Sequence, residues 1–313
     1  MARRVEDLRI DDAPGLPELF RRMEAAGGFS AKQVAEGVDL LTRMLADRKM
    51  TRFLSFPADI VATGTRGVLA SLVRDGYVDA VITTCGTLDH DLARSMRPYF
   101  HGAWDLDDAA LHRRHLHRLG NVVIPEANYG PTIERAMRRI LRRLWASGVR
   151  SLSTQALARA IGEAIPASAT SSLLRAAFER GVPVIVPGIT DGAVGSQLWL
   201  FWQDHRDLAV DLFADEQSLS DLVFDAARTG AIVLGGGISK HHTIWWNQFR
   251  GGLDAALYLT TAVEWDGSLS GARTREAVSW GKLKPRARHT NVEGDITVLF
   301  PLMVTAALER LKR

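Results

Sequence analysis

The chain has 313 residues, of which 46% are hydrophobic and 24% are charged, and its formal net charge at pH 7 is +3. This composition supplies a large buried core and does not demand a polyelectrolyte partner. The single cysteine excludes an intramolecular disulfide framework and suits a reducing cytoplasm. The charged N-terminus lacks the apolar core of a signal peptide, and no apolar run is long enough to span a bilayer.

The first half of the chain begins with a polar N-terminal arm, residues 1–29, in which one short helix is predicted at 15–26. Ser30 and Gln33 form the pattern of a capping box and predict a helix from 30 to 47. Apolar runs predict strands, and apolar residues at helical spacing predict helices. The strands are expected at 52–56, 78–84 and 121–124, and the helices at 63–75 and 131–146.

The second half continues the alternation of helices and strands. Helices are predicted at 168–180, 193–202 and 219–229, and strands at 183–186, 208–213, 231–234 and 255–261, with a helix between the last two strands. Residues 296–300 form a last short strand or join a final helix that ends near 310.

This alternation predicts an α/β fold, with a Rossmann-like, mostly parallel sheet and helices on both faces. No linker, repeat or low-complexity tract is apparent, so residues 30–313 are predicted to form one domain. Ligands of such sheets bind beyond the carboxyl ends of the strands. The segments that look functional, 57–59, 83–91, 187–192, 235–242 and 260–267, all follow predicted strands, which predicts one nucleotide-type site.

Three consecutive glycines, Gly235, Gly236 and Gly237, follow the strand at 231–234. Glycines at a strand end let backbone N–H groups approach an anionic ligand with no Cβ in the way. The pattern differs from the G-x-G-x-x-G fingerprint of dinucleotide-binding folds, and a simple chain reversal would also place glycines here.

Lys282, beside Trp280, is the candidate nucleophile. A nucleophilic amine must be neutral, and burial next to an indole would lower its pKa. A surface lysine after a turn is the alternative. His241 is a candidate proton shuttle, because an imidazole titrates near neutral pH. We predict no metal at His241 and His242, because adjacent side chains rarely converge on one ion.

Two basic segments invite other interpretations. If residues 112–117 were helical, His112 and His115 would share a face and could bind a metal, although a solvated basic helix is favoured. The arginine-rich segment 135–150 suggests an RNA-binding protein as an alternative function. Its spacing favours a half-buried helix with a solvated basic stripe, so we expect no nucleic-acid partner.

Four segments together resemble the deoxyhypusine synthase family, and the similarity runs from about residue 49 to 301. They are PG-x-TDG at 187–192, GGG-x-x-KHH at 235–242, T-A-x-E-x-D-G at 261–267 and SGAR-x-x-EAVSWGK at 270–282. The resemblance implies an aminobutyltransferase that uses NAD, with spermidine as donor and a lysine of a translation initiation factor 5A-type protein as acceptor. NAD would take a hydride from spermidine and later return it, while Lys282 holds the butyl fragment as an imine. The resemblance also implies a homotetramer with shared sites, and we expect a cytoplasmic location.

The resemblance implies further site residues. His241 would be the catalytic histidine, and Glu276, Trp280 and His241 would contact the polyamine, since a carboxylate pairs with an ammonium and an indole attracts a cation. The cofactor would be held by Asp59, Thr83, Thr84, Cys85, Gly86, Asp89, Asp191, Gly235, Gly236, Gly237, Thr261, Ala262 and Asp266.

At four positions the chain departs from the family pattern. Ser196 and Leu269 stand where the family has acidic substrate contacts, Trp245 stands for an asparagine, and His90 replaces the second acidic residue of the loop at 83–91. Two carboxylates are therefore missing from a pocket for a polycation. Transfer of the same fragment to a small amine such as putrescine, which gives homospermidine, is thus an alternative function.

Overall fold

The computed structural model describes residues 4–312 and divides into two compact units. One contains the chain up to Ser55 and from Ser220 onward, and the other contains residues 56–219. The prediction of one domain over 30–313 stays a prediction. Within residues 4–312, no helix has the length and apolar character needed to cross a bilayer.

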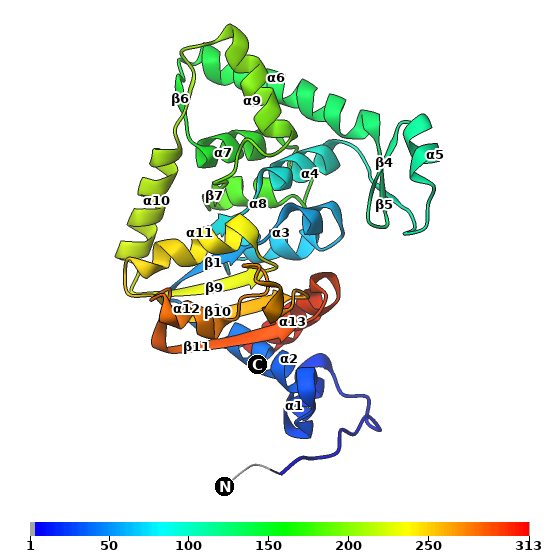
Figure 1. Cartoon of the computed structure of the whole chain (residues 1–313), viewed down its shortest axis with the longest axis vertical. Helices are drawn as coiled ribbons and strands as arrows, with labels where there is room; N and C mark the ends of the chain where they lie inside the picture. Colours follow the sequence, from blue (N-terminus) through cyan, green and yellow to red (C-terminus); the bar gives the residue numbers. More distant parts are fainter. Residues whose placement is uncertain (1–3, 313) are drawn as a thin grey trace. The chain divides into compact units, whose positions relative to one another are not determined.

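The first unit is built on four parallel strands (Figure 1). In sheet order they are β11 (Leu283–Glu293), β10 (Leu253–Thr260), β9 (Arg228–Leu234) and β1 (Met50–Ser55). The three strands β10, β9 and β1 are apolar and almost wholly buried, as expected for a parallel sheet covered on both faces. The order places the end of β9, and so the triple glycine, in the middle of this sheet.

Helices cover both faces of that sheet. A methyl group of Leu257 lies 3.4 Å from the point where a Cβ on Gly37 of α2 (Phe29–Ala46) would stand. The ring of the next residue, Tyr258, lies under the ammonium of Lys240, which belongs to α11 (Gly237–Gln248). Consecutive residues of a strand point to opposite faces, so α2 and α11 cover opposite sides. The fold class predicted from the sequence is confirmed.

The remaining helices of this unit are α1 (Leu16–Ala26), η3 (Glu264–Asp266), α12 (Thr274–Ser279) and α13 (Ile296–Leu311). The predicted capping box of α2 is wrong. The backbone is extended at Gly28 and turns helical at Phe29, so Ser30 lies inside the first turn and caps nothing. The last segment is helix α13 rather than a strand, and Asp295 caps it by accepting from the N–H groups of Thr297 and Val298.

The second unit contains the parallel pair β2 (Ala80–Ile82) and β7 (Val184–Ile185). It also contains the antiparallel sheet β3 (Phe100–His101), β5 (Val122–Pro125) and β4 (Leu116–Leu119), and the short pair β6 (Ser151–Leu152) and β8 (Ala209–Val210). Its helices are η1 (Ala58–Ala62), α3 (Arg66–Arg74), α4 (Cys85–Met96), α5 (Asp108–Arg113), η2 (Glu126–Asn128), α6 (Gly130–Ala146), α7 (Thr154–Ala164), α8 (Leu173–Arg180) and α9 (Ala193–Asp204). Helix α10 (Leu212–Asp225) runs across the boundary between the units in sequence.

Several elements differ from the sequence prediction. Residues 85–91, expected as a loop, are the start of α4, and α7 and β11 were not expected. The strand predicted at 208–213 shrinks to β8, and the helix predicted at 219–229 is α10, which ends at Asp225. Helix α5 ends at Arg113, and His115 has a left-handed backbone (φ 54°), so His112 and His115 do not share a helical face. The basic-helix interpretation of 112–117 is therefore wrong.

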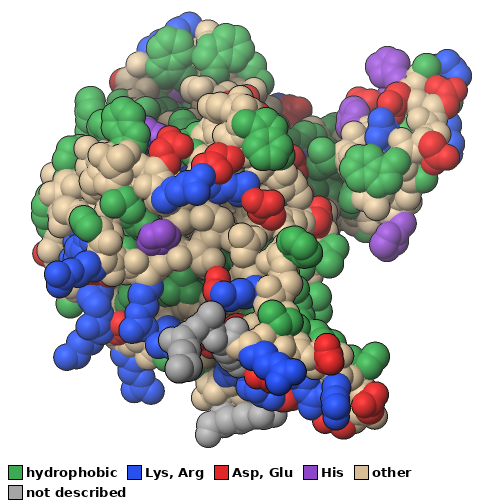
Figure 2. Space-filling view, turned by 60° about the horizontal axis from the view of Figure 1, so that its bottom comes forward, with side chains coloured by type: hydrophobic (Ala, Val, Ile, Leu, Met, Phe, Trp, Pro, Cys, Tyr) green, Lys and Arg blue, Asp and Glu red, His purple; other side chains and the backbone are tan. Residues whose placement is uncertain are grey.

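The surface carries charges of both signs. Figure 2 shows acidic side chains beside basic ones over much of the face in view, with one mainly basic cluster. Helix α6 buries Ile133, Met137 and Ile140 on one side, and its arginines lie on the solvent side. This confirms the half-buried helix with a basic stripe that the spacing predicts.

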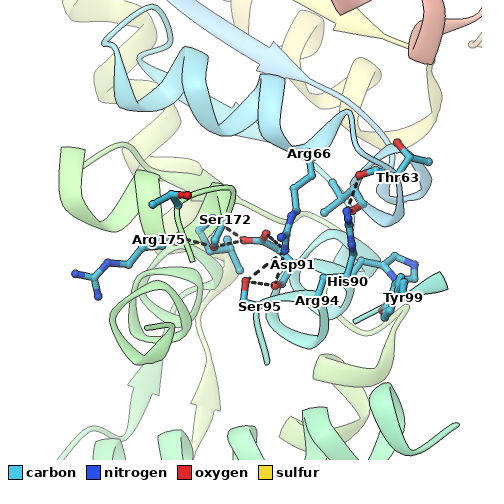
Figure 3. A network of polar contacts seen from close by, with 12 residues as sticks. Thr63, Arg66, His90, Asp91, Arg94, Ser95, Tyr99, Ser172 and Arg175 are labelled. Atoms are coloured by element: carbon cyan, nitrogen blue, oxygen red, sulfur yellow. Dashed lines mark hydrogen bonds and ion pairs between the residues drawn. The ribbon is translucent and has the colours of Figure 1, made fainter. Parts of the chain in front are cut away.

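A buried aspartate of α4 ties the second unit together. Asp91 accepts hydrogen bonds from Arg66 Nη1 (3.2 Å), from the hydroxyl of Ser172 (2.7 Å) and from the N–H of Leu174 (2.8 Å), as Figure 3 shows in part. Burial raises the pKa of Asp91, and these donors oppose that effect by favouring the ionised carboxylate. Because Ser172 and Leu174 begin α8, Asp91 holds that helix by its N-terminus.

Two other aspartates do the same for the neighbouring helices. Asp89 accepts from the N–H groups of Ala193 (2.8 Å) and Val194 (2.7 Å), the first turn of α9. Asp215 accepts from Thr154 (2.8 Å) and from the next residue, in the first turn of α7. The positive ends of α7, α8 and α9 are thus each matched by a carboxylate of the chain itself.

Candidate active site

The turn that ends α12 places Lys282. Gly281 has a left-handed backbone (φ 68°) and donates its N–H to Val278, while Lys282 donates its N–H to Ala277. This is a glycine C-cap, which only a residue without a Cβ adopts at low cost. The chain then enters β11, so the Lys282 side chain is directed from a rigid turn between a helix and a strand.

The amine of Lys282 lies in an aromatic and nearly dry environment. The residue is 7% exposed, and its Nζ lies 5.2 Å from the ring centroid of Trp280 and 5.7 Å from that of Trp245. Burial lowers the pKa of Lys282, and the charge of Glu276 opposes the shift. At a given pH, the neutral amine that a nucleophile needs is therefore more populated in Lys282 than in a lysine with an ordinary pKa.

His241 is the side chain nearest to that amine, with its Nε2 3.4 Å from Lys282 Nζ. Burial lowers the pKa of His241, and the positive charges of Lys282 and His242 add to the effect. An imidazole and an amine with lowered pKa values, at this separation, can pass a proton between them. His241 also stacks on Trp245, one turn further along α11, with ring centroids 5.6 Å apart and an interplanar angle of 26°.

The triple glycine forms the turn between β9 and α11. Gly235 (φ 75°) and Gly237 (φ 71°) have left-handed backbones, and a Cβ on Gly236 would lie 2.3 Å from Ser270 Cα. A Cβ on Gly237 would meet open space. The residue before the helix, Gly236, has no side chain that could cap the first turn of α11. Unlike α7 and α8, and like α9 with its N-cap Gly192, this helix begins without an N-cap side chain. Its Cβ-free backbone fits a phosphate group of a dinucleotide.

The other residues of the first unit predicted to hold the cofactor follow β10. Thr261 and Asp266 are exposed and Ala262 is half-buried. The carboxylate of Asp266 accepts a hydrogen bond from the N–H of Ser268 (2.6 Å), and hydrogen bonding to the side chain and backbone of Ser268 lowers the pKa of Asp266. An exposed, ionised carboxylate is a suitable acceptor for ribose hydroxyl groups.

The second unit holds the other predicted cofactor residues, and two of them serve the fold. The hydroxyl of Thr83 donates to Phe56 O (2.8 Å), and the thiol of Cys85 is buried, which raises its pKa to about 12. Thr84 precedes the first turn of α4, and Gly86 packs on Ala58, whose Cβ would lie 2.8 Å from an added one. The exposed members are Asp59, Asp191 and the predicted substrate residue Ser196, whose hydroxyl donates to Gly192 O (3.1 Å).

The carboxylate of Asp89 is already hydrogen-bonded within the protein, unlike a carboxylate that is free to contact a ligand. It is buried, and its oxygens accept from two N–H groups of α9 and from the hydroxyl of Tyr129 (3.0 Å). Burial raises the pKa of Asp89, against the effect of these donors. A cofactor hydroxyl would compete with these three donors, and the predicted cofactor role of Asp89 stays a prediction.

Sequence reasoning missed Lys240, which precedes His241 in the same motif. Its ammonium is buried and donates to two backbone carbonyls. The signal was available, because Lys240 shares one face of α11 with the buried residues Thr243, Ile244 and Asn247. Elsewhere in the part of the chain that the structure describes, no three His, Cys, Asp or Glu side chains gather as a metal site.

Comparison with known proteins identifies the family. The family model for deoxyhypusine synthase matches residues 18–307. A probable deoxyhypusine synthase of Ignicoccus hospitalis is 49% identical over 99% of this chain and 97% of its own length. One of Picrophilus torridus is 48% identical over 97% of each chain.

A solved structure from Entamoeba histolytica that carries the same family name superposes with a TM-score of 0.66 over 97% of each chain. Its identity to this chain is 18%, so it supports the fold alone. Since the family model and the relatives cover nearly the whole sequence, the chain belongs to the deoxyhypusine synthase family and is an aminobutyltransferase.

Proposed function

We propose that this enzyme transfers the 4-aminobutyl group of spermidine to a lysine of a translation initiation factor 5A-type protein, with NAD as cofactor. The observation that carries the proposal is the Lys282 amine, buried beside two indoles and 3.4 Å from the His241 imidazole. A surface lysine with no chemical role would not need a rigid turn, a lowered pKa and an adjacent proton carrier.

The chain's residues then perform an exchange of imines. The neutral amine of Lys282 attacks the carbon of a protonated imine of the polyamine, and the bond from that carbon to the propylamine nitrogen breaks. One protonated imine is lost and one is formed on Lys282, so charge balances. His241 takes the surplus proton from the Lys282 nitrogen and gives it to the departing amine. Trp280 and Trp245 lie within 6 Å of the nitrogen that carries the positive charge, and their ring faces stabilise it.

The glycine turn fits the phosphates of NAD, as its Cβ-free backbone and the helix start without an N-cap side chain indicate. When bound, NAD would accept a hydride from the carbon beside the secondary amine of spermidine and return it at the end. In the first unit, Asp266, Thr261 and Ala262 would hold the cofactor. The cofactor roles of Asp59, Asp191 and the residues at 83–86, in the second unit, stay predictions.

The polyamine would be anchored by Glu276 and the indole of Trp280. Glu276 is exposed on α12 and already acts on the charge of Lys282, so it faces the same site. Trp245, where the family pattern has an asparagine, would line the pocket without adding charge. The substrate role of Ser196, which stands for an acidic residue in the second unit, stays a prediction.

We further propose a homotetramer in the cytoplasm, where the translation factor is found. Support for assembly comes from large apolar side chains that one chain leaves exposed, two of them beside Lys282. Trp265 is 85% exposed, Trp280 61% and Trp245 40%. Water must be kept from the imines, and these indoles exclude it only if another surface covers them.

The test is a covalent trap. Enzyme incubated with NAD and spermidine, then reduced with borohydride, should carry one butylamine adduct on the peptide that contains Lys282. A Lys282→Arg variant should carry none, since a guanidinium is not nucleophilic at working pH. Lys284→Arg, two residues along the chain, is the matched control and should be labelled like the wild type. An adduct on any other lysine would overturn the assignment.

The acceptor needs its own measurement. Wild-type enzyme supplied with NAD and radiolabelled spermidine should label a translation initiation factor 5A-type protein, with a deoxyhypusine residue after acid hydrolysis. When putrescine replaces the protein as the acceptor, the enzyme should give little product. Homospermidine as the main product would show that the acceptor is a small amine rather than the protein.

A further inference from the structure

Lys240 has a role in the first unit that neither the mechanism nor the sequence assigns. The residue is 1% exposed, and its Nζ donates to the carbonyls of Leu269 and Ala272, each at 2.7 Å. The same ammonium stands 4.3 Å above the ring centroid of Tyr258, on β10. A flexible side chain is thus held at its charged end by the polypeptide.

Both acceptor carbonyls belong to the loop at 268–273, between η3 and α12. That loop lies directly on the glycine turn, since a Cβ on Gly236 would be 2.3 Å from Ser270 Cα. Within the loop, the N–H of Gly271 donates to the carbonyl of Ser268 (3.2 Å), whereas the carbonyls of Leu269 and Ala272 accept from a side chain outside the loop. Lys240 satisfies both.

Filling space does not explain a lysine here. A methionine or leucine would occupy the same volume without the cost of desolvating a charge. Burial in fact lowers the pKa of Lys240 to about 8. The useful property of an ammonium is that it donates several hydrogen bonds at once, and two of them bridge α11 to this loop.

We propose that Lys240 is a positioning residue that fixes the loop at 268–273 on the triple-glycine turn. The loop in turn leads into α12, which carries Glu276 and ends at the turn of Lys282. Lys240 therefore links the predicted phosphate cradle to the nucleophile. Its ammonium is enclosed by polypeptide, so it acts through the loop. The inference rests on the proposed function only in that the turn holds NAD.

The experiment compares Lys240→Met with Lys32→Met, an exposed lysine of α2 in the same unit. Hydrogen exchange is measured on the cofactor-free proteins, and NAD affinity by calorimetry. We expect the amides at 268–273 to exchange at least 10-fold faster in Lys240→Met and the Kd for NAD to rise at least 10-fold. Lys32→Met should match the wild type in both.

Chemical rescue separates a tie from a general loss of packing. In Lys240→Ala, propylammonium should slow exchange at 268–273 and restore NAD affinity, whereas propanol of the same size should not. If Lys240→Met does not fold, Tyr258→Leu, which removes the ring and leaves both carbonyls, should loosen the same amides. Wild-type exchange at 268–273 in these variants would overturn the proposal. If the wild type fails to bind NAD while Lys240→Met still loosens the loop, the tie stands and the cofactor assignment fails.

Discussion

Lys240 and Lys282 belong to neighbouring motifs of one region, and their contacts support the different roles that we propose for them. Burial lowers the pKa of both. The Lys240 nitrogen donates hydrogen bonds to two backbone carbonyls. The Lys282 nitrogen lies instead beside the His241 imidazole and two indole rings. Sequence context singles out Lys282 as the candidate nucleophile, whereas only the structure shows that the Lys240 ammonium is buried and bonded to backbone carbonyls.

The lowered pKa of Lys282 predicts its reactivity. Competitive acetylation with acetic anhydride, read by peptide mass spectrometry, should give Lys282 a titration midpoint below the ordinary lysine value. Because Glu276 raises the pKa of Lys282, Glu276→Gln should move that midpoint further down. A Lys282 midpoint at the ordinary lysine value would show that burial does not act on the amine.

Lys240 predicts a dependence of stability on pH. Its pKa is about 8 in the folded state and about 10.5 in the unfolded state, so between these values the unfolded chain binds more protons. The free energy of unfolding should therefore rise with pH across this window, by about 3 kcal/mol from this group. Urea unfolding at pH 8 and 10.5 should show this increment in the wild type and not in Lys240→Met.

At the scale of elements, the helices of the second unit and helix α11 use their N-termini differently. Asp89, Asp91 and Asp215 supply carboxylates to α9, α8 and α7, so those helix starts serve the fold. Helix α11 follows Gly236, which has no side chain, and its first turn is where we propose an anionic ligand. The contrast supports placing an anion at this turn.

Removing a cap should be costly. In Asp91→Asn the guanidinium of Arg66, which is buried, loses its counter-charge, and breaking one partner of a buried pair costs about 3–5 kcal/mol. Urea unfolding should show the loss. Asp108→Asn, which breaks an exposed pair with Arg118, is the control and should leave stability nearly unchanged. Equal stabilities of the two variants would contradict the tie through Asp91.

How far the sequence predicts this structure depends on where the information lies. Strands β9 and β10 and helices α6 and α9 follow apolar patterns and were found. Helix α7 was missed although Ser153, which caps it by accepting from Ala156, is a start signal. Strand β11 could not be found by pattern, since it is mostly polar. Helix α4 could not be found because its buried side includes two aspartates and a histidine as well as apolar residues. The two aspartates, Asp89 and Asp91, bind helix N-termini that are about 80 to 105 residues further along the chain, so a local pattern cannot reveal their role.

At the scale of the whole molecule, the mildly basic chain carries acidic side chains next to some of its arginines. Arginines of α6 are partly matched by acids, with Arg138 beside Glu134 and Arg143 beside Glu163. A phosphate backbone would have to displace these carboxylates.

RNA binding should accordingly be absent. Fluorescence anisotropy with a labelled single-stranded RNA at about 50 mM salt should give no saturable binding. A Glu134→Gln, Glu163→Gln variant frees two arginines and should gain weak, salt-sensitive binding. Tight binding by the wild type would return the RNA-binding alternative.

The indoles beside Lys282 have a practical consequence. Tryptophan emission responds to the polarity and charge around the ring. The Lys282 nitrogen, which we propose carries the covalent intermediate, lies 5.2 Å from the ring centroid of Trp280 and 5.7 Å from that of Trp245. The two indoles should therefore report on Lys282 without an added label. In a variant with the exposed Trp265 changed to phenylalanine, which lowers the background emission, the intrinsic tryptophan fluorescence should change during turnover.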